Sequence, residues 1–219
     1  MARTTVPLTL DHLEALAAPC RDCLFWERAP VERTKMAAAE RVADKEAWVS
    51  EVLREWGSCG RVAMVDGHPV GYLVYAPAAF VPGAAGFATS PVSADAVLLT
   101  TAWVRREYAG SGVGRLLVQG MARDLVLRAD GVRAVEAFGH TSSRLTAPGS
   151  CTLPVGFLAR TGFKTHRPHP VTPRMRMEMR SLVTWRGEVE AAWERLVGAV
   201  RRPHAAPARS LREADGPRS

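Results

Sequence analysis

Three glycines at alternate positions, Gly110, Gly112 and Gly114, mark the stretch of this sequence best suited to holding a ligand. They follow the apolar run Ala96–Val104, which is typical of a strand covered on both faces, and they open a segment of helical periodicity. Glycines let the backbone turn tightly with its N–H groups converging, and a helix start adds the positive end of its dipole. The pattern predicts a site for phosphate or pyrophosphate.

Two other glycine-rich phosphate sites differ from this turn. The nucleoside-triphosphatase loop needs Gly-Lys at the helix start, and the sequence has no Gly-Lys dipeptide. The dinucleotide pattern G-x-G-x-x-G needs a glycine where Arg115 stands. Taken alone, a G-x-G-x-G turn is weak evidence, because glycines also serve ordinary strand-to-helix turns.

The passage from Val97 to Phe138, which contains RREYAGSGVGRLL, resembles the central acyl-coenzyme A motif of the GNAT superfamily of N-acetyltransferases. VGFLARTGF, from Val155 to Phe163, is similar to a later helix and strand of that family, and the order of elements agrees from Thr5 to Met179. The segments PCRDCLFWE and EWGSCG are similar to an uncharacterised, mostly actinobacterial branch, which brings no substrate with it.

The resemblance implies acetyl-coenzyme A (acetyl-CoA) as cosubstrate. In the family the turn amides hold the pyrophosphate, and here that role falls on Gly110, Ser111, Gly112, Val113, Gly114 and Arg115. Strand residues near Trp103 and Val104 would pair with the pantetheine arm. Two positions depart from the pattern: its first basic or amide residue is Ala109, and the tyrosine that protonates the departing thiolate in many members is Leu158.

Glu136 and His140 are the candidate proton carriers. Acetyl transfer needs a neutral amine, a polarised carbonyl and a proton for the thiolate. Glu136, in the strand after the glycine-turn helix, is the candidate base; the alternative is a Glu paired with an Arg or facing solvent. His140 would relay protons, or it is simply an exposed loop histidine.

Other polar side chains near the turn have ordinary structural alternatives. Thr100 and Thr101 would donate hydrogen bonds near the thioester or serve only as strand formers. Tyr108 is expected to pack rather than to act as an acid, and Cys151 either replaces the missing acid or is a small apolar residue.

The four cysteines are sparse for 219 residues, which predicts reduced thiols rather than a disulfide scaffold. Cys20 and Cys23 form a C-x-x-C motif, for which zinc binding and redox work are the functional alternatives. A structural zinc site needs four ligands, and only the isolated Cys59, Cys151 or a histidine would complete it, so no metal is expected.

The elements that would position these residues follow from periodicity and turn signals. Helices are expected over 31–56, in one broken or two short pieces, over 112–128 and over about 154–161. Strands are expected over 5–10, 61–65, 70–75, 96–104, 132–138, 164–166 and 173–179, with a hairpin turn at Asp66-Gly67. The long loop 77–93 is a candidate lid. The expected class is α/β (α+β): a mixed, mostly antiparallel sheet flanked by helices, with an extra C-terminal helix.

Composition limits the classes of function. The chain is 47% hydrophobic and 23% charged, as in ordinary globular proteins, and no apolar run approaches a membrane span. The net charge is +7, and residues 201–219 carry five Arg and two acids, or +3 of it. Without a concentrated basic face or interleaved aromatics, no nucleic-acid binding is expected. A cytoplasmic location, with no membrane contact, is expected.

The sequence therefore predicts an acetyltransferase domain over 1–180, an amphipathic helix over 181–200 and a disordered basic tail over 201–219. The helix stripe at Trp185, Val189 and Trp193 either packs on the body or forms a homodimer seam. The predicted function is transfer of acetyl from acetyl-CoA to a primary amine of an unknown acceptor by direct attack. The alternative is a catalytically weak acyl-CoA-binding module with a protein-interaction role, which Ala109 and Leu158 favour.

Overall fold

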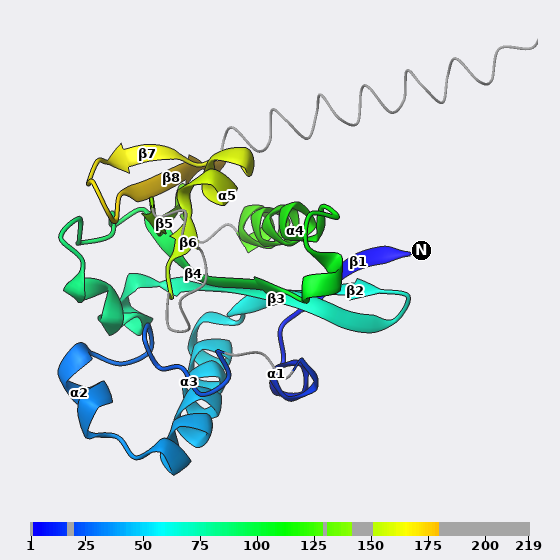
Figure 1. The fold of residues 1–219 in the computed structure, drawn as a ribbon, viewed down its shortest axis with the longest axis horizontal. Coiled ribbons are helices and arrows are strands. Elements are labelled where there is room, and N and C mark those ends of the chain that lie inside the picture. Colours follow the sequence, from blue (N-terminus) through cyan, green and yellow to red (C-terminus); the bar gives the residue numbers. More distant parts are fainter. Residues whose placement is uncertain (1, 17–19, 129–130, 142–150, 180–219) are drawn as a thin grey trace, which may run out of the picture. The chain divides into compact units, whose positions relative to one another are not determined.

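The computed structural model describes residues 2–16, 20–128, 131–141 and 151–179 (Figure 1). In these ranges the chain forms an eight-stranded sheet of order β1-β2-β3-β4-β5-β8-β7, with β6 paired to β5. Neighbouring strands are antiparallel except β4–β5 and β5–β6, which are parallel. The expected mixed, mostly antiparallel sheet is confirmed. The expected C-terminal helix and tail, 181–219, lie outside the described residues, so the domain boundaries stay predictions.

The N-terminal half supplies one edge of the sheet and the helices of one face. Its elements are β1 (Arg3–Pro7), α1 (Leu10–Ala15), α2 (Pro30–Lys35), η1 (Ala38–Glu40), α3 (Arg41–Trp56), β2 (Gly60–Val65) and β3 (His68–Pro77). The first strand ends before Leu10, where α1 begins, so the expected strand over 5–10 was placed too late. The expected helix over 31–56 is broken because Met36 and Ala37 adopt extended backbone between α2 and η1.

The C-terminal half contains the glycine turn and the other sheet edge. Its elements are η2 (Ala78–Phe80), η3 (Pro82–Gly86), β4 (Ala96–Val104), η4 (Arg106–Tyr108), α4 (Val113–Arg128), β5 (Ala134–His140), β6 (Leu153–Pro154), α5 (Val155–Arg160), β7 (Lys164–Arg167) and β8 (Arg174–Glu178). The apolar strand over 96–104 is confirmed as β4, and the hairpin turn is confirmed by positive φ angles of 48° at Asp66 and 84° at Gly67.

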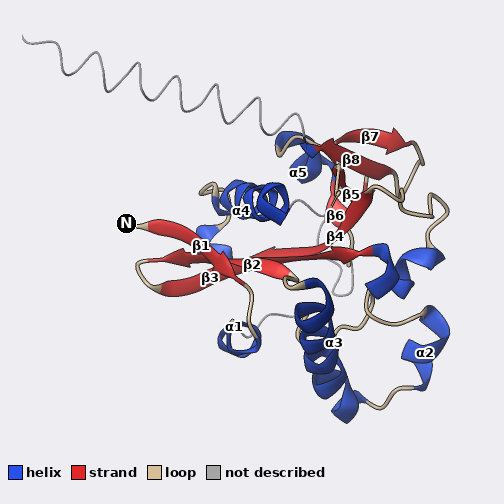
Figure 2. Ribbon diagram, turned by 180° about the vertical axis from the view of Figure 1, so that it is seen from behind, coloured by secondary structure: helices blue, strands red, loops and turns tan. Residues whose placement is uncertain are grey.

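Helices cover both faces of the sheet, so two apolar clusters form (Figures 1 and 2). On one face, α4 packs through Leu117 and Met121 against β-strand side chains such as Leu99. On the other face, α3 packs through Val49 and Val52. No helix in the described ranges is both long and apolar enough to cross a membrane.

The strands β4 and β5 separate part-way along their length, and this separation shapes the site. They pair only over Ala96↔Ala134, Val97↔Val135 and Leu98↔Glu136. Past that point β5 pairs with the short β6 instead, while β4 continues beside β3 alone among the described strands. The far half of β4 therefore has one edge whose backbone groups meet no neighbouring strand.

Candidate functional site

The glycine turn connects β4 to α4 and is open to solvent. Gly110 and Gly112 have φ angles of 74° and 88°, a region that residues with a side chain rarely adopt. A Cβ added at either glycine would meet nothing within 4 Å, so backbone conformation and not crowding requires glycine there. Gly114 differs, since a Cβ at this position would lie 2.8 Å from the ring of Phe157 in α5.

The turn presents N–H groups that the protein itself does not use. In the described part of the chain, the N–H groups of Gly112, Val113 and Gly114 donate to no other group. The carbonyls are braced instead: the Ser111 oxygen accepts from Arg3 Nη1 at 2.6 Å, and the Tyr108 oxygen accepts from Ser111 Oγ at 2.7 Å. Unused N–H groups at the positive end of a 16-residue helix form an anion site.

Trp103 and Val104 end the unpaired part of β4 beside this turn. On the β3 side they pair with Tyr72 and Gly71, which fixes the strand. Both are partly buried, and their other edge lies in the part of β4 that has left β5. An extended ligand chain can pair with such an edge as an added strand does.

Glu136 lies where β4 and β5 separate, and its side chain is 0% exposed. Its carboxylate accepts from Arg176 Nη1 at 3.2 Å and from the Ser93 N–H at 3.1 Å. Arg174 Nε lies 3.3 Å away, and His166 Nε2 lies at 3.8 Å. The strand β8 supplies both arginines, which are buried or partly buried beside Glu136, whereas Glu178 on the same side of the strand is exposed.

The two arginines around Glu136 have different surroundings. Desolvation lowers the pKa of Arg174, which is 3% exposed and whose Nη1 has no hydrogen-bond partner in the described part. The hydrogen bonds that Arg176 donates to Asp95 and Glu178 raise the pKa of Arg176. Glu136 was expected to be a base, a carboxylate paired with an Arg, or a carboxylate facing solvent. The contacts with Arg174 and Arg176 are those of the paired carboxylate.

His140 ends β5 on the far side of the strand separation. Its Nδ1 lies 3.1 Å from both the carbonyl oxygen and the hydroxyl Oγ1 of Thr152, so it either donates to the carbonyl or accepts from the hydroxyl, according to the tautomer. Nε2 is buried without a hydrogen-bond partner among the described residues. Thr152 therefore orients the ring, and in the tautomer in which Nδ1 donates to the carbonyl, Nε2 carries the lone pair of a base.

Other candidate side chains are engaged in the fold. Thr100 donates to the Val74 carbonyl at 3.2 Å and is buried, and Tyr108 packs against the core. Leu158, at the position of the family's tyrosine, is 0% exposed within the α4-side core. Ala109 is exposed and extends the turn.

An aromatic cluster packs around Phe138 of β5. Phe138 of β5 stacks on Phe87 with ring centroids 4.3 Å apart, and Trp26 stacks on Phe87 at 5.3 Å. Phe25 meets Trp26 edge-on at 5.0 Å. The loop 77–93 is held to this cluster, since the Gly83 N–H donates to the Trp26 carbonyl at 3.0 Å. The loop 77–93, which was the candidate lid, is therefore packed against the aromatic cluster by this hydrogen bond and by the Phe87 ring.

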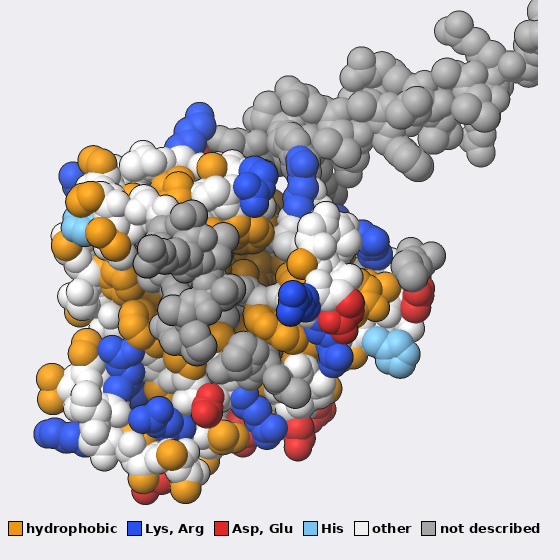
Figure 3. All heavy atoms as spheres, in the orientation of Figure 1, with side chains coloured by type: hydrophobic (Ala, Val, Ile, Leu, Met, Phe, Trp, Pro, Cys, Tyr) orange, Lys and Arg blue, Asp and Glu red, His pale blue; other side chains and the backbone are white. Residues whose placement is uncertain are grey.

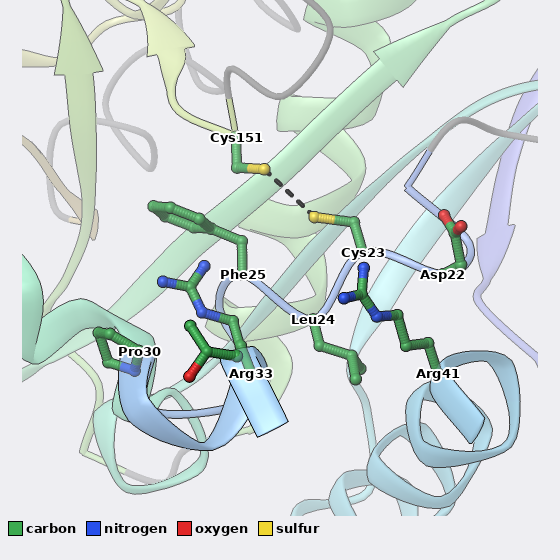
Figure 4. Close-up of a pocket in the computed structure, with 9 residues that line it drawn as sticks. Asp22, Cys23, Leu24, Phe25, Pro30, Arg33, Arg41 and Cys151 are labelled. Atoms are coloured by element: carbon green, nitrogen blue, oxygen red, sulfur yellow. Dashed lines mark hydrogen bonds between the residues drawn. The ribbon is translucent and has the colours of Figure 1, made fainter. Parts of the chain in front are cut away.

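A cavity of about 420 Å³ opens beside the aromatic cluster (Figure 4). Residues 22–25, α2, the first residue of α3 and Cys151 line it. Arg33 lies over the Phe25 ring at 4.4 Å, and the sulfur atoms of Cys23 and Cys151 point toward one another. Trp26 Nε1 donates to the Cys151 carbonyl at 2.9 Å, which ties this wall to the cluster.

The distribution of possible metal ligands and of charged side chains is as follows. Across the described ranges, no group of three His, Cys, Asp or Glu side chains is close enough to hold a metal ion. On the face shown in Figure 3, described Lys and Arg side chains are spread in separate groups among acidic and apolar ones.

Comparison with known proteins decides the family. A sequence profile of the Acetyltransferase (GNAT) family matches residues 22–147. The chain belongs to the GNAT acetyltransferase family. The match spans β4, the glycine turn, α4 and β5, so it includes Glu136 and His140 but not Thr152, Arg174 or Arg176.

Solved structures share this GNAT fold at low identity. PaiA N-acetyltransferase from Thermoplasma acidophilum in complex with coenzyme A is 14% identical, with a TM-score of 0.50, covering 81% of this chain and 99% of that one. Aminoglycoside acetyltransferase AAC(6')-Ib in complex with coenzyme A and kanamycin is 16% identical, with a TM-score of 0.54, covering 84% and 99%. An uncharacterized Bacillus halodurans protein is 12% identical, with a TM-score of 0.52, covering 83% and 86%. A search of curated proteins found no match.

The GNAT site contains residues that sequence reasoning did not assign. Arg174, Arg176 and Ser93 surround Glu136, and Thr152 orients His140. The strand expected over 173–179 does not by itself reveal which of its side chains meet Glu136. A contact such as that between Ser93 and Glu136, 43 residues apart, leaves no local pattern in the sequence.

Proposed function

We propose that this GNAT protein is an acetyl-CoA-dependent N-acetyltransferase in which a primary amine attacks the thioester directly. The observation that carries the proposal is the exposed glycine turn with unused N–H groups at Gly112, Val113 and Gly114, beside the free edge of β4. Such a turn suits a pyrophosphate, and the free edge suits an extended arm. The solved PaiA and AAC(6')-Ib structures of the same fold contain coenzyme A, which supports this ligand.

The cosubstrate residues are those that the turn and the strand edge bring together. The turn residues Gly110, Ser111, Gly112, Val113, Gly114 and Arg115 would hold the pyrophosphate, mainly through backbone amides. Trp103 and Val104 would pair with the pantetheine arm. Ala109 contributes no side-chain donor, so the amides and the helix dipole supply the attraction for the phosphates.

His140 is the proposed proton carrier. Its partnerless Nε2 accepts the proton of the attacking amine, and the protonated ring then returns that proton to the departing thiolate sulfur. One residue would thus do the work of both base and acid, which suits a chain with Leu158 at the tyrosine position. Glu136, engaged by Arg176 and the Ser93 N–H, would act by position, holding β5 to β8 close to His140.

The cavity lined by residues 22–25, α2 and Cys151 is the proposed acceptor site. Cys151 comes two residues before β6, which pairs with the end of β5 at His140. An amine in the cavity would therefore approach from the side on which the proposed base lies. Aminoglycoside is the acceptor class of one structural neighbour, and the acceptor of this chain is left as a primary amine.

Calorimetric titration with acetyl-CoA, CoA and NADH tests the cosubstrate. We expect acetyl-CoA and CoA to bind and NADH not to bind. Gly112→Trp places a bulky side chain in the open turn and is expected to weaken CoA at least about tenfold, or about 1.4 kcal/mol. Gly67→Trp is the matched control, since Gly67 also has a positive φ and open space but lies in the β2–β3 hairpin. Equal CoA affinity in both folded variants would refute the site.

A second candidate function is a catalytically weak acyl-CoA-binding module that serves a protein partner. The buried Leu158 in place of the family's tyrosine favours it. An amine-library acetylation screen separates the two: turnover of any primary amine supports the enzyme, while CoA binding without turnover supports the binding module.

A further inference from the structure

Two thiols from distant parts of the chain meet in the wall of the cavity. Cys23 precedes α2, Cys151 precedes β6, and their sulfur atoms lie 3.2 Å apart (Figure 4). Both residues line the cavity and are only partly buried, so small reagents can reach them. The residues are 128 positions apart, so the contact depends on the folded chain.

Separate hydrogen bonds hold the backbone on each side of this contact. Lys45 Nζ donates to the Cys23 carbonyl at 3.1 Å, and Lys45 is itself paired with the buried Glu27. Trp26 Nε1 donates to the Cys151 carbonyl at 2.9 Å. The two thiols therefore face each other because both chain segments are anchored and not because two mobile side chains happen to meet.

The electrostatic surroundings make the two thiols unequal. The hydrogen bond from Cys151 lowers the pKa of Cys23 to about 6, and the same contact raises the pKa of Cys151. The charge of Lys45 adds to the lowering at Cys23. Because the Lys45 ammonium is held at the Cys23 backbone, it favours a thiolate on Cys23, and Cys23 is therefore assigned as the nucleophile of the pair.

We propose that Cys23 and Cys151 are a redox-active thiol pair, which hydroperoxides oxidise to a disulfide and dithiols reduce again. The Cys23 thiolate attacks one peroxide oxygen, an S–O bond forms, the O–O bond breaks, and the released alkoxide or hydroxide takes the Cys151 proton. The Cys151 thiolate then attacks the Cys23 sulfur; the S–S bond forms, and hydroxide leaves and becomes water with a proton from solvent. Two thiols lose two electrons, which reduce the peroxide.

The disulfide would tie residues 22–25 to the segment before β6 across the cavity wall. This consequence rests on the proposed function, because the cavity is the proposed acceptor site. A covalent link there removes the freedom of the two segments to separate around an acceptor. Oxidation is therefore expected to lower the rate of acetyl transfer while leaving the glycine turn, and hence CoA affinity, unchanged.

Peptide mapping of the full-length protein tests the pair without any activity assay. Trypsin cuts after arginine, and each of the four cysteines falls on its own peptide: Thr4–Arg21, Asp22–Arg28, Glu55–Arg61 and Leu145–Arg160. After hydrogen peroxide and alkylation, the expected product is a cross-link of Asp22–Arg28 to Leu145–Arg160, reversed by dithiothreitol. Cys59, which is 0% exposed with a pKa raised by burial to about 12, is the internal control and should stay a thiol.

Other products would overturn the proposal. A Cys20–Cys23 link would mean that the C-x-x-C motif is the reactive unit, and recovery of all thiols at peroxide doses that oxidise free cysteine would mean that no reactive pair exists. In Cys151→Ser, the expected product is a Cys23 sulfenic acid trapped by dimedone, because the second thiol is missing. Oxidation of Cys20 instead of Cys23 in that variant would contradict the assigned order.

Rates of acetylation then test the consequence separately. Oxidised protein should turn over more slowly than reduced protein and recover with dithiothreitol, whereas Cys151→Ser should be insensitive to brief peroxide treatment. A disulfide that forms without a change in rate would overturn the regulatory part alone. Absence of acetylation in the reduced protein would overturn the proposed function and leave the peptide map valid.

Discussion

His140 shows how backbone contacts can prepare a side chain for chemistry. Histidine is the one side chain whose ordinary pKa lies near neutral pH, but either ring nitrogen can carry the proton. Thr152 contacts Nδ1 through both its carbonyl and its hydroxyl oxygen, and Nε2 is buried without a partner among the described residues. Glu136 has the opposite character, since two arginines and a backbone N–H occupy its oxygens. The difference in partners, and not the residue type, separates the proposed proton carrier from the positioning residue.

His140→Gln is expected to lower kcat by about 10²- to 10⁴-fold, the usual worth of a general base, with CoA affinity unchanged. The amide can still donate to the Thr152 carbonyl, so the end of β5 keeps its contact while the basic nitrogen is lost. His68→Gln is the matched control, because His68 is exposed in the β2–β3 hairpin. Steady-state kinetics with the amine found by the screen gives the answer. A kcat within twofold of the parent in a CoA-binding variant would remove His140 from the mechanism.

At the scale of single residues, the sequence predicts the turn better than the proton chemistry. The alternate glycines 110, 112 and 114 signal a local backbone conformation, and the structure has positive φ at the first two. The surroundings of Glu136 come from β8 and from Ser93, 43 residues away, and such partners depend on topology. The contact between Cys23 and Cys151 is likewise invisible in the C-x-x-C spacing.

At the scale of elements, α4 and α5 approach each other closely at Gly114. A Cβ there would lie 2.8 Å from Cε2 of Phe157, nearer than normal packing allows. Glycine inside a helix ordinarily lowers stability by about 0.5–1 kcal/mol relative to alanine. The close approach of Phe157 explains why glycine is nevertheless present at position 114, in addition to its place in the turn. The approach places α5 against the start of the helix that carries the proposed anion site.

Gly114→Ala is expected to lower the free energy of unfolding by about 1–3 kcal/mol, because the added methyl group overpacks the Phe157 ring. Gly156→Ala in α5 is the matched control: its Cβ would meet only the far end of the Arg160 side chain, at 3.4 Å, and should gain up to about 1 kcal/mol of helix propensity. Urea unfolding midpoints of the two variants should move in opposite directions. If Gly114→Ala raised the free energy of unfolding instead, Phe157 and α5 would be shown to move away from the added methyl group without loss of stability.

Element types were predictable where one periodicity runs unbroken. The apolar run 96–104 and the stripe over 112–128 correspond to β4 and α4, since burial on both faces or on one stripe leaves a clear pattern. The stretch 31–56 was harder, because good helix formers continue through Met36 and Ala37 while the chain there is extended to wrap the cavity. Tertiary demands overrode local propensity at that place.

At the scale of the whole molecule, the order of helices and strands along the sequence predicts the sheet topology better than any single side chain does. A parallel step from β4 through α4 to β5, within a mostly antiparallel sheet, follows from the βαβ pattern of 96–138. The separation of β4 and β5 does not follow from it, because the number of paired residues depends on how β6 and β8 attach to β5. Family membership then gives the general chemistry, while the proposed acceptor site is a cavity lined by residues 22–25, α2, Arg41 and Cys151, which no local sequence pattern brings together.

Removal of residues 201–219 is expected to leave both CoA affinity and the free energy of unfolding unchanged. The segment carries +3 of the net +7, so its loss leaves +4 on the rest of the chain. Charges outside the site act on an anionic ligand over a Debye length of about 8 Å at 0.15 M salt, so charges farther than that from the ligand are largely screened. Calorimetric titration of both proteins with CoA at 0.15 M and at about 0.01 M salt checks this. The screening length is longer at low salt, so any loss of CoA affinity caused by removing the positive charges should appear there. A loss of affinity at 0.15 M would place part of the cosubstrate site in the tail and move the predicted domain boundary beyond residue 200.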